Sequence, residues 1–205
     1  MTVSIQYNSE FKDYTLSSFT QQWATQHGDI KDTGAEGYSK DFGQFAGGGY
    51  FDGTQYSVSS SHGTGTAMIV EGDLKYSFMT QHTFYGKMEG LELGKGLINN
   101  PNGIDKQLND VQLKLCNIDI TGDYNPELTK EQNHQGEMHK ATYGLMRGNA
   151  EPLLEILAAK GIDINTPLKD MAIASQLDTS NEMMADAPMI DTVGAYDGGD
   201  ILMAA

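Results

Sequence analysis

The sequence predicts an α+β fold in which helices pack on one face of a curved antiparallel sheet. Strand-like segments follow one another from about residue 54 to residue 120, separated by turn residues and without helical sequence between them. After about residue 136 the apolar residues instead recur at helical spacing, so strands come first and helices follow. The 205 residues show no internal repeat and no clear boundary, so we expect a single domain over residues 1–190.

The N-terminal region is expected to contribute a short strand and one helix. Residues 3–7 alternate between apolar and polar side chains, as a half-buried strand does. A helix follows, with Ser17 or Ser18 as its N-cap and Gly28 as its end. Apolar side chains recur along this helix at helical spacing, and the single tryptophan, Trp23, is expected to anchor the core on that face.

A long polar, glycine-rich loop over residues 29–50 precedes the sheet. A connector of this length inside a compact domain is usually functional or mobile. The sheet itself is expected to be a meander, because turn signals such as residues 99–103 separate its strands. The predicted strands comprise residues 55–60, 66–71, 74–79, 82–93 and 111–120.

Helices are expected in the C-terminal part of the chain. The first comprises residues 136–146, and the second comprises residues 150–160 and ends at Gly161. Thr166 and Pro167 form a good cap and first-turn pair, and they predict a third helix that extends to about residue 177.

The composition restricts the partners of the chain. A net charge of −15 with only 13 basic residues disfavours nucleic acid, whose phosphates need clustered Lys and Arg, and also anionic membranes. No apolar run approaches the ~20 residues of a transmembrane helix, so no membrane insertion is expected.

The N-terminus lacks the basic and apolar regions of a Sec-type signal peptide. The single cysteine, Cys116, excludes an intramolecular disulfide and is expected to be a structural thiol.

A tyrosine and a histidine six residues apart form the most informative pattern of the chain. Tyr76 and His82 lie in strand-like sequence, and a tight reversal between them would bring their side chains together on neighbouring strands. A tyrosine has a pKa near ~10, and an imidazole acceptor can draw on its proton. A phenolate suits ferric iron, and tyrosine is a known axial ligand of haem. The alternative is that these are ordinary packed strand residues.

A second group of side chains shares one face of the predicted helix 136–146. His139, Tyr143 and Met146 stand at i, i+4 and i+7, which places them on the same side of a helix. On spacing alone, an ordinary core-facing stripe is the favoured interpretation. A zinc site at His134 and His139 is disfavoured, because no Cys or paired acidic ligand completes a tetrahedral set.

These motifs resemble those of the HasA-type hemophores, secreted bacterial proteins that scavenge haem. The segment GDLKYSFM with the following HTFYG resembles their haem-binding strand pair, and HKATYGLMRG resembles the motif that lines their pocket. The resemblance extends from residues 5–8 to the terminal alanines. It implies ferric haem b as the cofactor, Tyr76 as the axial iron ligand and His82 as its hydrogen-bond partner. The haem-pocket contacts that it implies are Phe51, Tyr56, Phe78, Phe84, His139, Tyr143 and Met146.

The resemblance also implies a function. A hemophore is a non-enzymatic extracellular carrier that takes haem from host haemoproteins and delivers it to an outer-membrane receptor. Residues 191–205 form an acidic, glycine-rich stretch with a short apolar end, which is expected to be flexible. The tail resembles the uncleaved C-terminal signal of hemophores secreted by a type I route. The alternatives are a haem-dependent enzyme or sensor that uses the same pocket, and an ion-binding module, which no EF-hand spacing or nonapeptide repeat supports.

One position departs from the family pattern. Many hemophores supply a second iron ligand, a histidine in the loop after the first helix. Here Asp32 stands at the matching position, in the segment GDIKD, and the next loop residues offer no histidine. A carboxylate is a poor partner across a haem from a phenolate, because two anionic ligands would face each other. We therefore expect Tyr76 to hold the iron alone.

Overall fold

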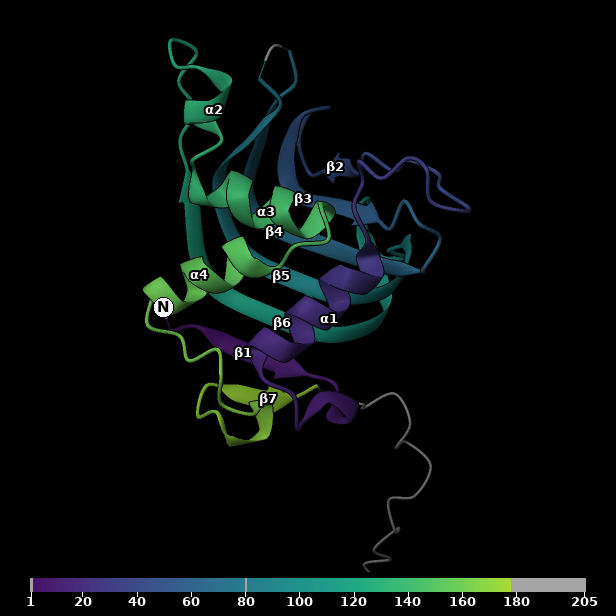
Figure 1. Cartoon of the computed structure of the whole chain (residues 1–205), viewed down its shortest axis with the longest axis vertical. Coiled ribbons are helices and arrows are strands. Elements are labelled where there is room, and N and C mark those ends of the chain that lie inside the picture. The colour runs from purple at the N-terminus through teal and green to yellow at the C-terminus, as the bar shows by residue number, and fades with distance from the viewer. Residues whose placement is uncertain (1, 80, 178–205) are drawn as a thin grey trace, which may run out of the picture.

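The computed structural model describes residues 2–79 and 81–177 and confirms the α+β fold. A seven-stranded sheet, in the order β2-β3-β4-β5-β6-β1-β7, curves around helices that pack on one of its faces (Figure 1). The strands are β1 Ser4–Tyr7, β2 Gln44–Ala46, β3 Asp52–Ser59, β4 Thr66–Ser77, β5 Thr83–Asn99, β6 Lys106–Gly122 and β7 Ala174–Gln176. The α-helices are α1 Leu16–His27, α2 Lys130–Asn133, α3 Glu137–Met146 and α4 Glu151–Ala159, and two 3₁₀ turns comprise Ser9–Phe11 and Leu168–Asp170.

The central strands are longer than the sequence pattern predicts. Residues 66–71 and 74–79 were expected as separate strands, but residues 66–77 form one strand, β4, which continues through a bulge in its pairing with β5 at Glu71 and Gly72, and Phe78 and Met79 lie in the turn that follows. Gly72 has a φ of 149°, and a Cβ there would collide with the carbonyl oxygen of Lys87. A glycine in the sequence therefore indicates a bulge in a continuous strand here and not a turn.

Helix α1 forms as expected but begins at a different cap. Thr15, and not Ser17 or Ser18, is the N-cap, and it forms a reciprocal capping box with Ser18. The helix buries its apolar face against the sheet, where the Trp23 side chain is 2% exposed. The Trp23 indole nitrogen donates a hydrogen bond to the carbonyl oxygen of Gly94 at 3.1 Å, which confirms Trp23 as a core anchor.

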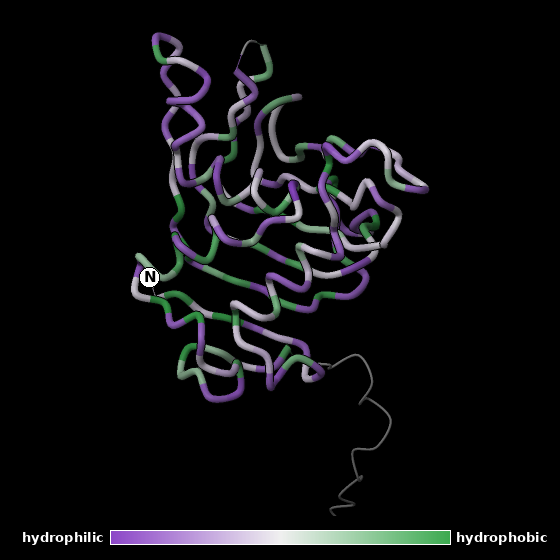
Figure 2. Tube along the Cα trace, in the orientation of Figure 1, coloured by the Kyte–Doolittle hydropathy of each residue, from purple (hydrophilic) through white to green (hydrophobic). Residues whose placement is uncertain are grey.

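The main core lies between the inner face of the sheet and helices α1, α3 and α4. Leu74, Met88 and Leu113 of the sheet and Leu145 and Leu153 of the helices are each 0% exposed. Figure 2 shows hydrophobic positions along the strands and helices of the body, whereas the segment around α2 is largely hydrophilic. Helices α3 and α4 match their predicted ranges within one residue at each end.

The prediction of a third C-terminal helix, from residue 166 to about residue 177, is wrong. After the short turn Leu168–Asp170 the chain extends, and β7 pairs in parallel with β1. Burial of Leu168 and Met171 holds the turn in the core, and the free edge of β1 then offers backbone partners to the extended residues. The sheet is therefore mixed at this edge, although its other strand pairs are antiparallel.

The expected tail, residues 191–205, lies outside the described residues. Its flexibility and the domain boundary near residue 190 stay predictions. Within residues 2–79 and 81–177, no helix is long and apolar enough to cross a membrane.

Candidate functional site

Tyr76 and His82 meet at the tip of the β4–β5 hairpin. In the strand register Tyr76 lies opposite Phe84, and β5 begins at Thr83. His82 is therefore the last residue of the turn, not the strand residue that was predicted. Its φ of 51° lies in the left-handed region, which non-glycine residues seldom adopt. This turn brings the His82 Nδ1 atom to 3.1 Å from the Tyr76 phenolic oxygen, so the expected contact is present.

The surroundings of Tyr76 keep its phenol protonated in the absence of a metal. Burial raises the pKa of Tyr76 above its ordinary value of 10, and the nearby Tyr143 phenol raises it further. The neutral phenol can then donate its hydrogen bond to His82 Nδ1. The protein environment therefore favours the neutral phenol over the phenolate.

Aromatic side chains surround Tyr76 at the surface. Phe51 and Phe78 stack with their ring centroids 4.7 Å apart, and the Phe51 carbonyl oxygen accepts a hydrogen bond from the Tyr76 amide at 2.8 Å. Phe78 is 46% exposed, and beside these two residues Tyr50 and Met79 are 86% and 76% exposed. Sequence reasoning did not identify Tyr50 and Met79, although both are large apolar residues next to predicted site positions. Such an exposed apolar patch suits an apolar ligand or partner.

A second layer of predicted site residues lies below this surface. Phe84 is 5% exposed, and its ring centroid lies 4.7 Å from that of Tyr76 and 5.0 Å from that of Tyr56. Tyr56 is 2% exposed and donates its hydroxyl hydrogen bond to the carbonyl oxygen of Phe42 at 2.8 Å. The Met146 sulfur lies 3.6 Å from the same hydroxyl. Tyr56, Phe84 and Met146 thus support the surface layer from beneath.

The three residues on the α3 face differ in depth. His139 is 3% exposed, and its Nδ1 atom accepts a hydrogen bond from the Phe84 amide at 3.2 Å. Burial, together with the nearby His134 and Lys130, lowers the pKa of His139 to about 3, so its ring is neutral at pH 7. Tyr143 is only partly buried, and its ring centroid lies 5.2 Å from that of His139. Of this stripe, Tyr143 reaches the surface near Tyr76.

The loop over residues 29–43 is fixed at both of its ends. Arg147 forms a bidentate ion pair with Asp29 at 2.6 and 2.8 Å, and the Ile30 amide donates to the Met146 carbonyl oxygen at 3.0 Å. At the other end the Tyr56 hydroxyl binds Phe42, whose side chain is 70% exposed. Between these ends the loop extends from the side of the molecule, apart from the hairpin tip (Figure 1).

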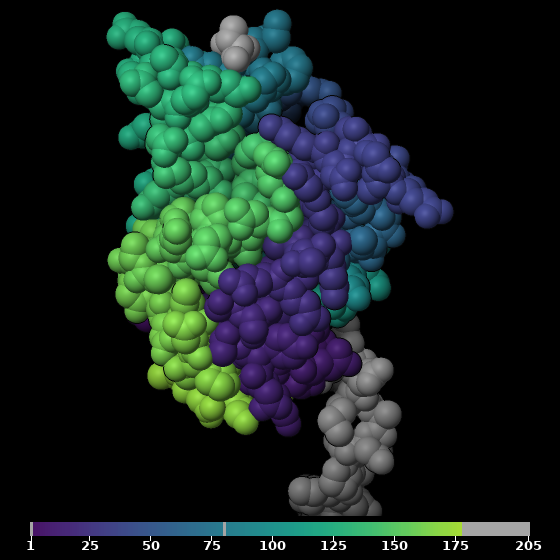
Figure 3. All heavy atoms as spheres, viewed as in Figure 1, coloured from purple at the N-terminus to yellow at the C-terminus, as the bar shows by residue number. Residues whose placement is uncertain are grey.

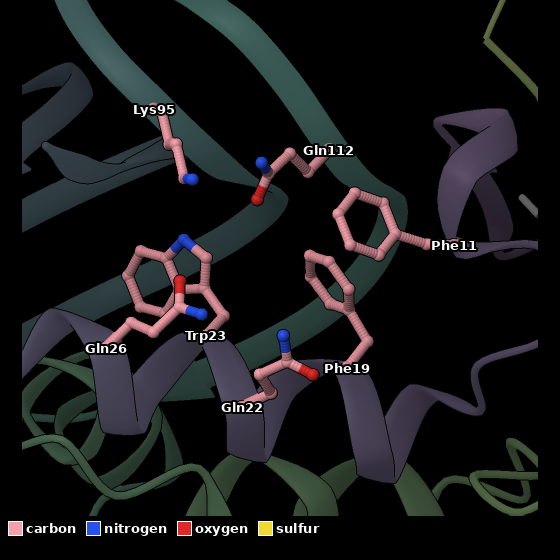
Figure 4. Close-up of a pocket in the computed structure, with 7 residues that line it drawn as sticks. All are labelled: Phe11, Phe19, Gln22, Trp23, Gln26, Lys95 and Gln112. Atoms are coloured by element: carbon pink, nitrogen blue, oxygen red, sulfur yellow. The ribbon is translucent and has the colours of Figure 1, made fainter.

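Two hollows lie outside this cluster. One, of about 80 Å³, is lined by Trp23, Lys95 and Gln112 among others, between α1 and strands β5 and β6 (Figure 4). The other, of about 450 Å³, lies beside α2. None of the predicted haem-site residues lines either hollow. The surface around Tyr76 is instead an open aromatic patch between the hairpin, β3 and α3.

Comparison with known proteins identifies the family. The sequence model of the family described as Heme-binding protein A (HasA) matches residues 1–205. The chain belongs to the HasA family. The hemophore HasA of Serratia marcescens is 30% identical over 194 residues, which cover 92% of this chain and 97% of that protein.

Solved HasA structures have the same fold. Apo HasA from Yersinia pestis superimposes with a TM-score of 0.82 and 45% identity, covering 86% of this chain and 99% of that one. The holo hemophore HasA from Yersinia pestis, with a TM-score of 0.81, has the same identity and coverage. A tyrosine-to-alanine mutant of HasA from Yersinia pseudotuberculosis is 44% identical, with a TM-score of 0.81 and coverage of 86% and 99%. The resemblance of the motifs to HasA-type hemophores is thus confirmed for the chain as a whole.

Proposed function

We propose that this member of the HasA family is a hemophore that binds haem at the Tyr76 surface and carries it without altering it chemically. The observation that carries the proposal is the Tyr76–His82 pair, a phenol and an imidazole 3.1 Å apart within an exposed aromatic patch. A porphyrin needs a flat apolar surface and an iron ligand that projects from it. The patch and the phenol supply both, and the family of haem-binding proteins to which the chain belongs points to the same ligand.

The phenolic oxygen of Tyr76 fits the ferric iron of haem b better than it fits ferrous iron or a softer metal ion. A phenolate oxygen is a hard, anionic ligand and is an established axial ligand of haem iron. Tyr76 would hold the iron, and His82 would accept the phenolic hydrogen bond or donate to the phenolate once the proton has left. Phe51, Phe78 and Tyr143 would contact the macrocycle, with Tyr56, Phe84, His139 and Met146 below them. When bound, ferric iron supplies the positive charge that makes the phenolate stable.

Two cations stand beside Tyr143. The Lys31 ammonium lies 5.7 Å from the centroid of the Tyr143 ring, and the Arg147 guanidinium lies 5.9 Å from it. In a chain with a net charge of −15, Lys31 is the natural partner for a haem propionate, because Arg147 is already paired with Asp29. Asp32 is exposed next to Lys31 and would not serve as an iron ligand opposite a phenolate.

The location and partners of the protein follow from the hemophore role. We infer that it is secreted by a type I route, with residues 191–205 as the export signal, and that it works outside the cell. Its source of haem would be host haemoproteins, and its acceptor would be an outer-membrane hemophore receptor. A carrier of this kind uses binding and release and requires no catalytic residue.

Replacing the ligand tests the proposal. Tyr76→Phe keeps the ring but removes the oxygen, so ferric haem affinity should fall by more than about 100-fold, since altering a ligand's hydrogen-bond partner alone costs up to that much. Titration with ferric haem, followed by its visible spectrum, measures the affinity. Tyr85→Phe is the matched control on β5, and neither it nor Asp32→Ala should change the affinity. Wild-type affinity in Tyr76→Phe would refute the ligand assignment, and a large loss in Asp32→Ala would refute the single-ligand site.

A further inference from the structure

We propose that Gln81 is a positioning residue of the haem site, which fixes the turn that places His82 against Tyr76. It does so through Asn133 and His134 of the α2 arm, which we define as residues 123–136. This inference rests on the proposed haem-binding function and adds to it a residue that does not touch the ligand. The arm and the hairpin project from the same end of the molecule, as Figures 1 and 3 show.

Gln81 is buried at a hairpin tip where the side chains of Phe78, Met79 and His82 are exposed. It is 9% exposed, whereas Phe78 and Met79 in the same turn are 46% and 76% exposed. Its side-chain nitrogen donates to the carbonyl oxygen of Leu128 at 2.8 Å, and its side-chain oxygen accepts from the Asn133 amide nitrogen. An amide is buried at little cost only when its polar atoms are paired, as they are here. Gln81 therefore joins the turn firmly to the arm.

The partner on the arm is equally well fixed. Asn133 is 3% exposed, and its side chain also donates to the Asn125 carbonyl oxygen at 2.8 Å and accepts from the Asn125 amide at 2.9 Å. The same side chain thus closes the arm on itself and binds the hairpin. Because both side chains are buried and hydrogen-bonded to each other, the arm and Gln81 are held together.

A second set of contacts holds the other side of the turn. The carbonyl oxygen of Gln81 accepts a hydrogen bond from His134 Nε2 at 2.7 Å, and the His134 ring stacks on His139 with centroids 3.8 Å apart. His139 in turn accepts a hydrogen bond from the Phe84 amide. His82 therefore lies between two anchored residues, Gln81 and Phe84.

The conformation of His82 explains why such anchors are needed. With a φ of 51°, His82 has a backbone conformation that carries strain for a non-glycine residue. A strained residue keeps its conformation only where the surrounding structure holds it in place. Gln81 precedes His82 in the chain, and both its side chain and its main-chain carbonyl oxygen form hydrogen bonds with the α2 arm. If these bonds are lost, the turn can relax, and His82 Nδ1 no longer stays within 3.1 Å of the Tyr76 oxygen.

The test is a double-mutant cycle between Gln81 and His82. Gln81→Met keeps the volume of the side chain and removes its hydrogen bonds. The variant should release ferric haem about tenfold faster than wild type. Altering the hydrogen-bond partners of a metal ligand typically costs about 10- to 100-fold in affinity, and tenfold is the lower end of that range. In a His82→Ala background the same substitution should add almost nothing, because Gln81 acts through His82. Gln135→Met, on an exposed part of the arm, is the matched control and should leave haem release unchanged.

A measurement on the haem-free protein makes the test independent of haem. In Gln81→Met the Phe84 amide should exchange with solvent about tenfold faster, while amides of the central strands keep their protection. Gln81→Glu, which keeps the acceptor for Asn133, replaces Gln81→Met in the same cycle if the latter does not fold. Full additivity with His82→Ala, or unchanged exchange at Phe84, would overturn the role of Gln81. Failure of the wild-type protein to bind haem would instead refute the proposed function.

Discussion

Acid should destabilise this protein through a buried histidine that closely precedes the loop over residues 29–43. His27 ends α1, is 3% exposed and stacks on Trp23 with ring centroids 4.6 Å apart. Its Nδ1 atom lies 3.1 Å from the Thr66 hydroxyl, which is also buried. Burial lowers the pKa of His27 from 6.5 to about 4, a change that Asp41 partly opposes and His62 reinforces. The folded protein therefore keeps this ring neutral at pH values at which the unfolded chain protonates it.

The size of the effect follows from these two pKa values. Between about pH 6.5 and pH 4 the unfolded state binds more protons than the folded state, so the free energy of unfolding falls as the pH falls. The contribution of a neutral His27 is complete above about pH 6.5 and is lost by about pH 4. At about 1.36 kcal/mol per pH unit, the whole difference amounts to about 3.4 kcal/mol, of which about 2.4 kcal/mol is lost between pH 7 and pH 4.5.

Urea unfolding of His27→Gln and wild type at pH 7 and pH 4.5 measures this contribution. Fluorescence of Trp23, the single tryptophan, reports on the transition directly beside the mutated ring. The variant should be less stable at pH 7 because it packs less well, yet it should lose about 2.4 kcal/mol less than wild type on acidification. His139 is present in both proteins, so its own titration cancels. Equal losses in the two proteins would show that His27 does not control acid stability.

Two further predictions concern the hairpin and the tail. Gly86→Ala should cost at least about 2 kcal/mol of unfolding free energy, because Gly86 has a φ of 105° and an added Cβ would collide with the Asp73 carbonyl oxygen. Gly34→Ala, where the nearest atom is 3.8 Å away, is the control, and equal unfolding midpoints in urea would contradict the argument. Removing residues 201–205 should block export but leave haem affinity unchanged, as measured by secretion assay and haem titration. Normal secretion of the truncated protein would refute the export signal.

The sequence predicted the elements whose periodicity is strong and local. Helices α3 and α4 and the strands β4 to β6 have regular apolar patterns, which the core requires. Strand β7 could not be predicted, because its three residues extend only where the edge of β1 accepts them. A cap such as Thr166-Pro167 favours a helix locally, but the burial of Leu168 and Met171 decided the outcome.

For the site, the sequence predicted which side chains share a face but not how deep they lie. The spacing of Tyr76 and His82 allowed their contact, and the structure contains it. The depth of Tyr56 depends on a hydrogen bond to Phe42, which lies on a separate loop. Gln81 gave no signal at all, since a glutamine in a turn is ordinarily solvated. Its role depends on an arm about 50 residues further along the chain, to which its side chain is bonded over sequence separations of 47 and 52.

Hydrogen bonds hold both the hairpin and the loop over residues 29–43 at the candidate site. The hairpin that carries Tyr76 is fixed by the α2 arm and by α3. The loop is held at Asp29 and Phe42, and between them the Ser39 amide donates to the Ser61 carbonyl oxygen at 2.7 Å, whereas Asp32 is exposed. If Tyr76 alone holds the iron, as proposed, affinity would be determined on the hairpin side. Release of haem would then require only that the bond between Tyr76 and iron be weakened. The contacts that hold His82 against Tyr76 would in that case influence both how tightly haem is kept and how readily it is removed.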